Sequence, residues 1–556
     1  MKKRFIIISL LIPVLAVLPL FGQELDPLKS NLTYDFRILA AAADNRGYDV
    51  QHYNFDWIFN PGSSSVNGWA RVLAKSTASA LTVLKLDLAG AMVVSRVIQN
   101  CQPLTFSQAN GSLNITLDRA YASGQEFEVE IGYEGVPSQN LTFTQHSGQP
   151  IIYSLDEPIG ARQWFPCHDI PDDKATAEIR ITVPGDMIAA SNGRLTETAA
   201  NADGTRTYAW EEDTPISTYL LFVAATNYTL LRDTYASASG TMDVVHYVYP
   251  ELVNQAQEDF NRTVSMIAFF SRMFGEYPFF QEKYGHALIP GGTAMEHQTC
   301  TSYPARSVLG THAYDWLVAH ELAHSWWGDF VTCGDWKDIW LNEGFATYSD
   351  ALWHEEIGGK AGLKARMQQH KDTYLTHQPP DHPIYDPPEG HLFCRIIYQK
   401  AAWVLHMLRF VVGDQNFWNI LAAYRQRFGA GNALTSDFMA VCEEVSGQSL
   451  DWFFSQWIYG SGIPAYEFGW GRVPGSNTVQ VVINQVQQDS PLFRMPVELE
   501  FVFGDGSTQR ETVVVDQARH RFDFSLSRVP TAVRFDPDFW ILCRQEPFQK
   551  KGKRGN

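Results

Sequence analysis

The chain has 556 residues, which is too long for one ordinary domain and predicts about three or four domains. Its hydrophobic content of 45% and mean hydropathy of -0.19 exclude a disordered chain and a polytopic membrane protein. The 61 acidic residues outnumber the 43 basic ones and give a formal charge of -18. This charge argues against a nucleic-acid partner, because binding to phosphates requires a positive surface.

The N-terminus has the pattern of a secretory signal peptide. Lys2, Lys3 and Arg4 precede an apolar run over residues 5–21, after which the chain turns polar. We therefore predict a signal peptide over 1–22 and an exported mature protein that is periplasmic, secreted or at the cell surface. An uncleaved membrane anchor is the alternative. The run is shorter than the roughly 20 residues that span a bilayer and contains prolines, which argues against the anchor. No later stretch could cross a bilayer, so no stable membrane insertion is expected after cleavage.

The next part of the chain has strand patterns. Residues 80–88 and 127–133 alternate apolar and polar side chains at period two, and Gly, Asn and Pro punctuate them. These patterns predict an N-terminal β-sheet domain over 23–234.

The middle of the chain has helical patterns. Residues 251–274 carry apolar side chains at helical spacing, and similar patterns continue to about residue 460 around a proline-rich loop at 378–388. A mainly helical domain is therefore predicted over 235–462.

Strand patterns return in the last part of the chain. Three segments are predicted strands: 478–484, 497–503 and 511–515. A Gly-Asp-Gly turn signal at 504–506 separates the last two. A second β domain is predicted over 463–548, followed by a basic tail at 549–556, and the whole chain is predicted to be a multidomain α+β protein.

One motif in the helical domain carries chemistry. His320, Glu321 and His324 form an H-E-x-x-H, which on a helix places both imidazoles on one face, where they can bind one Zn²⁺. Glu321 lies beside them and can act as a general base. Glu343 follows on a second apolar segment and can supply a third ligand, which leaves the open position that a catalytic zinc needs. We therefore predict one zinc ion per chain.

A structural zinc site is the alternative to a catalytic one. Such a site is usually closed by a fourth ligand, and Cys333 is the nearby candidate. Other histidines lack metal-ligand spacing and are predicted to be satisfied locally: His312, His354, His391 and His406.

The context of the motif carries a resemblance to a known family. The segment HELAHSWWGD at 320–329, followed by WLNEGFA at 340–346, is similar to the aminopeptidase N family of gluzincin metallopeptidases. The resemblance implies an N-terminal β saddle, a thermolysin-like catalytic domain and a small C-terminal β sandwich. It also implies a short member of the family, without the large helical C-terminal domain that many members have.

Three further segments extend the resemblance. GTAMEH at 292–297 resembles the Gly-x-Met-Glu-Asn exopeptidase motif, with Thr293 at the usual Gly and His297 at the usual Asn. ARQWFPCHD at 161–169 resembles the Ala-Arg-x-x-Phe-Pro-Cys-x-Asp pattern of the family. YQKA at 398–401 resembles Tyr-x-Lys-Gly, with Ala at the usual Gly.

The resemblance assigns roles to residues outside the zinc motif. Glu296 and Glu157 would bind the free α-ammonium of a substrate by charge-assisted hydrogen bonds, although Glu157 could be an ordinary loop acid. Tyr398 would donate a hydrogen bond to the developing oxyanion, its alternative being a buried packing residue. The remaining predicted substrate-binding residues are Gly292, Ala294 and Met295, of which Gly292 could equally form a plain turn.

These features together predict a zinc-dependent aminopeptidase that acts on the N-termini of peptides or proteins. A zinc endopeptidase is one alternative, because such enzymes use the same zinc ligands and base. An endopeptidase would, however, have no use for an ammonium clamp, the pair of acids Glu296 and Glu157 that would bind a free α-ammonium. A lipid epoxide hydrolase is a second alternative, since one branch of the family has that activity. A non-catalytic peptide-binding protein is the third, and it would be expected to lose a zinc ligand, the base or the tyrosine.

Overall fold

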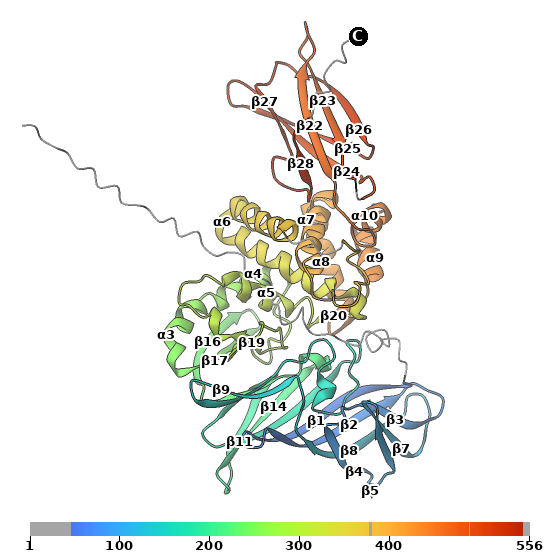
Figure 1. Cartoon of the computed structure of the whole chain (residues 1–556), viewed down its shortest axis with the longest axis vertical. Coiled ribbons are helices and arrows are strands. Elements are labelled where there is room, and N and C mark those ends of the chain that lie inside the picture. Colours follow the sequence, from blue (N-terminus) through green and yellow to red (C-terminus); the bar gives the residue numbers. More distant parts are fainter. Residues whose placement is uncertain (1–45, 377–380, 489, 549–556) are drawn as a thin grey trace, which may run out of the picture.

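The computed structural model describes residues 46–376, 381–488 and 490–548 and arranges them in three parts along one long axis (Figure 1). A β-rich N-terminal part lies at one end, a mainly helical part in the middle, and a second β-rich part at the C-terminal end. The predicted multidomain α+β class is confirmed. The predicted signal peptide at 1–22 and basic tail at 549–556 lie outside the described residues.

The N-terminal part is built on an eight-stranded sheet. Across the sheet the strands are β13 (Arg194–Ala200), β14 (Thr205–Ile216), β11 (Ala175–Pro184), β1 (Tyr48–Asn60), β2 (Ser65–Ser76), β8 (Glu126–Gly135), β4 (Met92–Gln99) and β5 (Gln102–Pro103). Neighbours are antiparallel except β1 and β11, which are parallel. Buried and more exposed residues alternate along β2, so its period-two pattern gives the sheet one core-facing side.

Two smaller sheets complete the N-terminal part. One contains β12 (Ile188–Ser191), β15 (Val223–Thr226), β10 (Gln149–Ser154) and β9 (Leu141–His146), and the other contains β3 (Leu81–Asp87), β7 (Ser112–Tyr121) and β6 (Phe106–Ala109). Beyond β10 the chain packs Trp164 against Trp57, with ring centroids 4.5 Å apart. Both indoles are fully buried, which anchors this segment to the large sheet.

The helical part contains a sheet that was not predicted. Its strands are β16 (Thr229–Ser237), β17 (Gly240–Val248), β18 (His286–Ile289) and β19 (Thr301–Pro304). Every residue of β18 and β19 is buried, so neither strand shows the period-two alternation that reveals a half-buried strand. The predicted domain boundary after residue 234 falls within β16, which pairs along its whole length with β17.

The helices of this part surround α5 and α6. They are α3 (Val253–Asp259), α4 (Thr263–Phe274), α5 (Asp315–His324), α6 (Trp340–Thr376), the π-helix Ile396–Lys400, α7 (Ala401–Val412), α8 (Asp414–Phe428), α9 (Thr435–Ser446) and α10 (Asp451–Trp457). Two short strands, β20 (Val331–Cys333) and β21 (Gly431–Ala433), pair in parallel. Non-helical backbone at Gly359 interrupts α6.

The helical spacing noted over 251–274 is confirmed, but the segment forms two helices, α3 and α4, with a break between them. Asp259, the last residue of α3, accepts hydrogen bonds of 2.7–2.8 Å from the backbone N–H groups of residues 309–312. Arg262 in the break pairs with Asp315, the first residue of α5. The break therefore fixes the start of α5.

Two sheets form the C-terminal part. The first contains β26 (Arg519–Ser525), β23 (Thr478–Gln485), β22 (Ala465–Arg472) and β28 (Arg544–Glu546), and the second contains β25 (Thr508–Val515), β24 (Met495–Val502) and β27 (Ala532–Phe535). Phe501 of the second sheet lies against Phe524 of the first, with ring centroids 4.9 Å apart. His406 of α7 stacks on Trp540 at 4.5 Å, which joins this part to the helical part.

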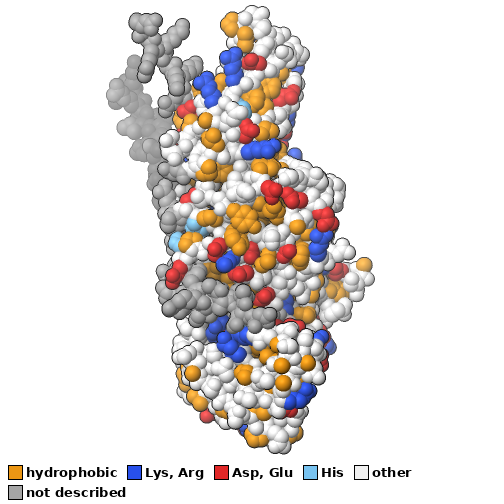
Figure 2. All heavy atoms as spheres, turned by 90° about the vertical axis from the view of Figure 1, so that its right-hand side faces the viewer, with side chains coloured by type: hydrophobic (Ala, Val, Ile, Leu, Met, Phe, Trp, Pro, Cys, Tyr) orange, Lys and Arg blue, Asp and Glu red, His pale blue; other side chains and the backbone are white. Residues whose placement is uncertain are grey.

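Three further features concern the whole of the described chain: its helices, its cysteines and its surface charges. Among the helices within the three described ranges, none is long and apolar enough to cross a membrane. All seven cysteines lie in these ranges and are free thiols. On the face shown in Figure 2, acidic and basic side chains are interspersed with hydrophobic ones.

Candidate active site

The H-E-x-x-H histidines and Glu343 converge in the middle of the helical part. His320 and His324 lie one turn apart on α5, and their Nε2 atoms are 3.2 Å apart. Each Nε2 is 3.4 Å from Oε2 of Glu343, and all three side chains are buried. Ligand atoms of a tetrahedral zinc site with metal–ligand distances of about 2.0–2.1 Å lie about 3.3–3.4 Å apart. The donor set and its geometry therefore fit Zn²⁺.

A backbone contact determines which nitrogen of His324 faces this position. Its Nδ1 donates to the carbonyl oxygen of Trp327 at 3.1 Å, so Nε2 carries the lone pair that a metal needs. Gly328 lies against the same ring. Its φ is +139°, and an added Cβ would lie 2.9 Å from Nδ1. A larger residue at 328 would displace the ligand.

Glu343 is held in place by its neighbour in the sequence. Asn342 accepts a hydrogen bond from the backbone N–H of Cys333 at 3.1 Å and donates one to the hydroxyl of Tyr219, in the N-terminal part, at 3.2 Å.

The Cys333 side chain belongs to no group of potential metal ligands in the part of the chain that the structure describes. The geometry therefore favours the open triad over a closed structural site.

A buried ionic cluster lies behind His320. Asp350 of α6 accepts two hydrogen bonds from Arg366, at 2.7 and 2.9 Å, and lies 3.1 Å from Nε2 of His370. Burial alone would raise the pKa of Asp350, but Arg366 and His370 hold it well below its usual range. Burial lowers the pKa of His320; Glu343 is the main influence in the opposite direction, and the charge of Asp350 adds a smaller one. No pattern in the sequence had predicted this cluster.

Four buried carboxylates surround the metal position. Side-chain oxygens of Glu157, Glu296 and Glu343 lie within 4.8 Å of one another, as do ligand atoms of Glu296, Glu321 and His324. Burial lowers the pKa of His324, but Glu296 and Glu343 outweigh this effect and raise that pKa to about 10. The site thus has an excess of negative charge, which favours cations in addition to a metal ion.

Glu157 reaches this centre from the N-terminal part. It follows β10, and the ARQWFPCHD motif fixes its loop: Nε1 of Trp164 donates to both carboxylate oxygens of Asp156, at 3.1 and 3.0 Å. Arg162 pairs with Asp169 at 2.8 Å. The motif was identified from the sequence, but this positioning role was not.

The segment before Glu296 contains the other predicted substrate-binding residues. Met295 exchanges two backbone hydrogen bonds of 3.0 Å with Ser302 of β19, and both Met295 and Ala294 are buried. Gly292 has a φ of +81°, and an added Cβ would make only ordinary contact with Leu155 at 3.5 Å. The backbone conformation, and not close packing, favours glycine there.

The structure accommodates both departures from the exopeptidase motif. The Thr293 hydroxyl donates to the carbonyl oxygen of Ala294 at 2.7 Å. His297 is buried and stacks on Phe222 of the N-terminal part, with ring centroids 4.3 Å apart. His297 therefore contributes to packing between the two parts.

Tyr398 contacts a member of the triad directly. It lies on the π-helix Ile396–Lys400, and its hydroxyl donates to Oε1 of Glu343 at 2.7 Å. Burial and the charge of Glu343 raise the pKa of Tyr398 well above its usual value, so the phenol stays a hydrogen-bond donor. Gly344 makes this approach possible, because a Cβ there would lie 2.7 Å from Cβ of Ala401.

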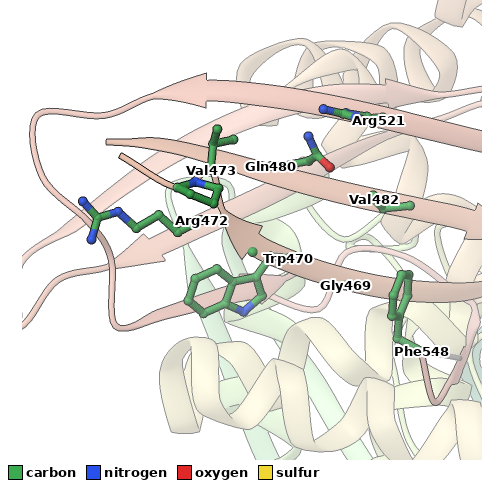
Figure 3. A pocket seen from close by; sticks show the side chains of 10 residues that line it. Gly469, Trp470, Arg472, Val473, Gln480, Val482, Arg521 and Phe548 are labelled. Atoms are coloured by element: carbon green, nitrogen blue, oxygen red, sulfur yellow. The ribbon is translucent and has the colours of Figure 1, made fainter. Parts of the chain in front are cut away.

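A separate hollow lies on the C-terminal part (Figure 3). It has a volume of about 470 Å³, and Trp470, Arg472, Arg521 and Phe548 are among its lining residues. The lining residues within the described part of the chain include no acid, histidine or cysteine.

Two models of one peptidase family match the chain. Their match agrees with the site, in which two histidines and one glutamate form a metal centre between a β-rich and a helical part. The Peptidase M1 N-terminal domain matches residues 50–220, and the Peptidase family M1 domain matches residues 258–457. The chain belongs to peptidase family M1. The resemblance found in the sequence is thereby confirmed.

Curated relatives are aminopeptidases. Glutamyl aminopeptidase of Homo sapiens is 29% identical over 367 residues, and probable aminopeptidase 1 of Saccharolobus solfataricus is 27% identical over 362 residues. These matches cover 62% and 61% of this chain but only 38% and 45% of the relatives. The chain thus matches less than half the length of each relative.

Matches to solved structures cover a larger share of both chains than the matches to these relatives do. An M1 zinc metallopeptidase from Deinococcus radiodurans, in a mutant form bound to a Tyr-Ser-Ala substrate, is 29% identical with a TM-score of 0.66, and the match covers 75% of this chain and 96% of that one. Aminopeptidase A of Legionella pneumophila is 21% identical with a TM-score of 0.78, over 91% of this chain and 60% of that one. The second likeness shows a shared fold alone.

Proposed function

We propose that the protein is a zinc-dependent aminopeptidase that hydrolyses the N-terminal peptide bond of peptides or proteins. The observation that carries this proposal is the position of Glu157 and Glu296 beside the zinc triad. Two buried carboxylates next to a metal position are suited to a free α-ammonium, which they bind by charge-assisted hydrogen bonds. Neither Glu157 nor Glu296 belongs to the triad that would bind the metal.

The proposed chemistry divides among the residues of the chain. When bound at the triad, zinc supplies a Lewis acid that lowers the pKa of water and polarises the scissile carbonyl. Glu321 accepts the proton of the attacking water and returns it to the leaving amine. Tyr398 donates a hydrogen bond to the oxygen that becomes negative. Glu157 and Glu296 hold the ammonium and so set the position of the first peptide bond.

The alternatives each leave part of the site unexplained. A zinc endopeptidase uses the triad and Glu321 but gains nothing from a buried ammonium clamp. A peptide-binding protein gains nothing from a general base or from a tyrosine donor beside the metal position. A lipid epoxide hydrolase requires an apolar channel next to the triad, whereas three buried carboxylates other than Glu343 lie beside it.

The finer architecture and the location of the protein are part of the proposal. We assign a β saddle to the N-terminal part, a thermolysin-like catalytic domain to the helical part from β16 to about residue 462, and a β sandwich to the C-terminal part. Family membership and the packing of Phe501 of one sheet against Phe524 of the other support these assignments. The signal-peptide pattern at 1–22 supports export to the periplasm, the cell surface or the medium.

The test compares free and blocked substrates. The purified protein is given a panel of amino-acid 4-nitroanilides and their N-acetylated counterparts, with and without a zinc chelator. We expect turnover of free-amine substrates only, lost with the chelator and restored by zinc. Equal turnover of acetylated substrates would support the endopeptidase instead. Zinc binding without turnover of either substrate would refute the proposed activity.

A further inference from the structure

A second group of potential metal ligands lies outside the active site. Ligand atoms of His382, His391 and Cys394 lie within 4.8 Å of one another. His391 was predicted to be satisfied locally, and neither His382 nor Cys394 was predicted as a ligand. The chain between 381 and 394 folds back on itself and brings the three together just before the π-helix that carries Tyr398.

The geometry of His382 is that of a metal ligand. Its Nδ1 donates to the carbonyl oxygen of Pro383 at 2.7 Å, which leaves the lone pair on Nε2. Nε2 in turn lies 3.5 Å from Sγ of Cys394. In a tetrahedral site with Zn–S of about 2.3 Å and Zn–N of about 2.0–2.1 Å, nitrogen and sulfur ligands lie about 3.6 Å apart. This pair therefore already has the spacing of a zinc site.

His391 completes the group from the other end of the loop. Its ring lies 5.3 Å from that of His382, centroid to centroid, at an interplanar angle of 74°. The side chain of His382 is buried, while those of His391 and Cys394 are half-buried. An ion from solvent can therefore reach the three ligand atoms. Burial raises the pKa of the Cys394 thiol, but a metal displaces the thiol proton when it binds.

We infer that His382, His391 and Cys394 form a second metal site, which takes a zinc-class divalent transition metal. Two imidazoles and one thiolate suit zinc and its neighbours rather than the hard cations Mg²⁺ and Ca²⁺. The carbonyl oxygen of Cys394 accepts the N–H groups of Ile397, at 2.9 Å, and Tyr398, at 3.3 Å. A metal on Cys394 therefore anchors the loop to the first turn of the π-helix.

Cobalt substitution tests the site separately from the proposed activity. The active-site triad contains no sulfur, so a thiolate-to-cobalt charge-transfer band reports only the second site. The metal-free protein is titrated with Co²⁺ and followed by absorbance and by metal analysis of the desalted protein. We expect a second equivalent of cobalt, together with the band.

Variants assign the band to its ligands. Cys394→Ser should remove the band and the second equivalent while keeping the first, and the matched thiol control Cys101→Ser should behave as wild type. His320→Ala should lose the active-site metal and keep the band, whether or not the protein is an aminopeptidase. A wild-type protein without the band, or a band that persists in Cys394→Ser, overturns the inference. If Cys394→Ser does not fold, His391→Gln carries the same expectation for the second equivalent.

Discussion

Replacing Glu296 by glutamine tests the ammonium clamp most directly. The substitution keeps the size of the side chain and removes its charge. Oε1 of Glu296 is buried, lies 3.9 Å from Nδ1 of His324 and makes no hydrogen bond within the described residues, so it can accept one from a ligand. A hydrogen bond to a charged group contributes about 1.5–3 kcal/mol, so we expect kcat/KM for free-amine substrates to fall by about 10- to 150-fold.

The assay measures kcat/KM for an amino-acid 4-nitroanilide, with the zinc content of each variant determined in parallel. Glu444→Gln, an exposed acid on α9, is the matched control and should behave as wild type. Zinc content should stay unchanged in Glu296→Gln, because Glu296 is not a member of the triad. A fall of less than about threefold with full zinc content would refute the clamp, since it is smaller than the weakest charged hydrogen bond expected here.

The remaining predictions concern the proposed catalytic residues Tyr398 and Glu321 and the metal-binding site. Tyr398→Phe should lower kcat by about 10²- to 10³-fold with little change in KM, as expected for a donor to an oxyanion; an unchanged kcat would contradict this role. Glu321→Gln should lower kcat by about 10²- to 10⁴-fold with zinc retained, which metal analysis checks. Gly328→Ala should weaken zinc binding by about 10- to 100-fold in a chelator competition, because it displaces His324. Gly413→Ala is its control, with positive φ but open space around the Cβ, and equal zinc affinity in the two variants would refute the steric argument.

The residues of the triad could be predicted because their geometry follows from local rules. Residues at i and i+4 share a helix face, so His320 and His324 needed only a helix to converge. Glu343 needed a second helix packed against the first, and the apolar flanks of both segments indicated such packing. The distances of 3.2–3.4 Å between ligand atoms are consistent with these inferences.

Features that depend on tertiary contacts could not be predicted in this way. The segment 251–274 has helical spacing throughout, yet the chain breaks after Asp259, whose carboxylate binds the backbone N–H groups of 309–312, some 50 residues later. Likewise, β18 and β19 lack alternation because they are buried on both sides. The proximity of His382, His391 and Cys394 arises from an irregular loop, which has no periodicity to read.

The charge of the active site links metal binding to substrate choice. The metal contributes two positive charges against four carboxylates, so the site remains negative after the metal binds. A neutral, acylated N-terminus would bring no positive charge to the carboxylates of Glu157 and Glu296, and adding a neutral group to this negatively charged, buried region is costly. A free ammonium compensates them. The preference for a free N-terminus would then come from repulsion between buried acids as much as from attraction to the substrate. Removing either acid should therefore relax the discrimination against acetylated substrates as well as weaken binding of free ones.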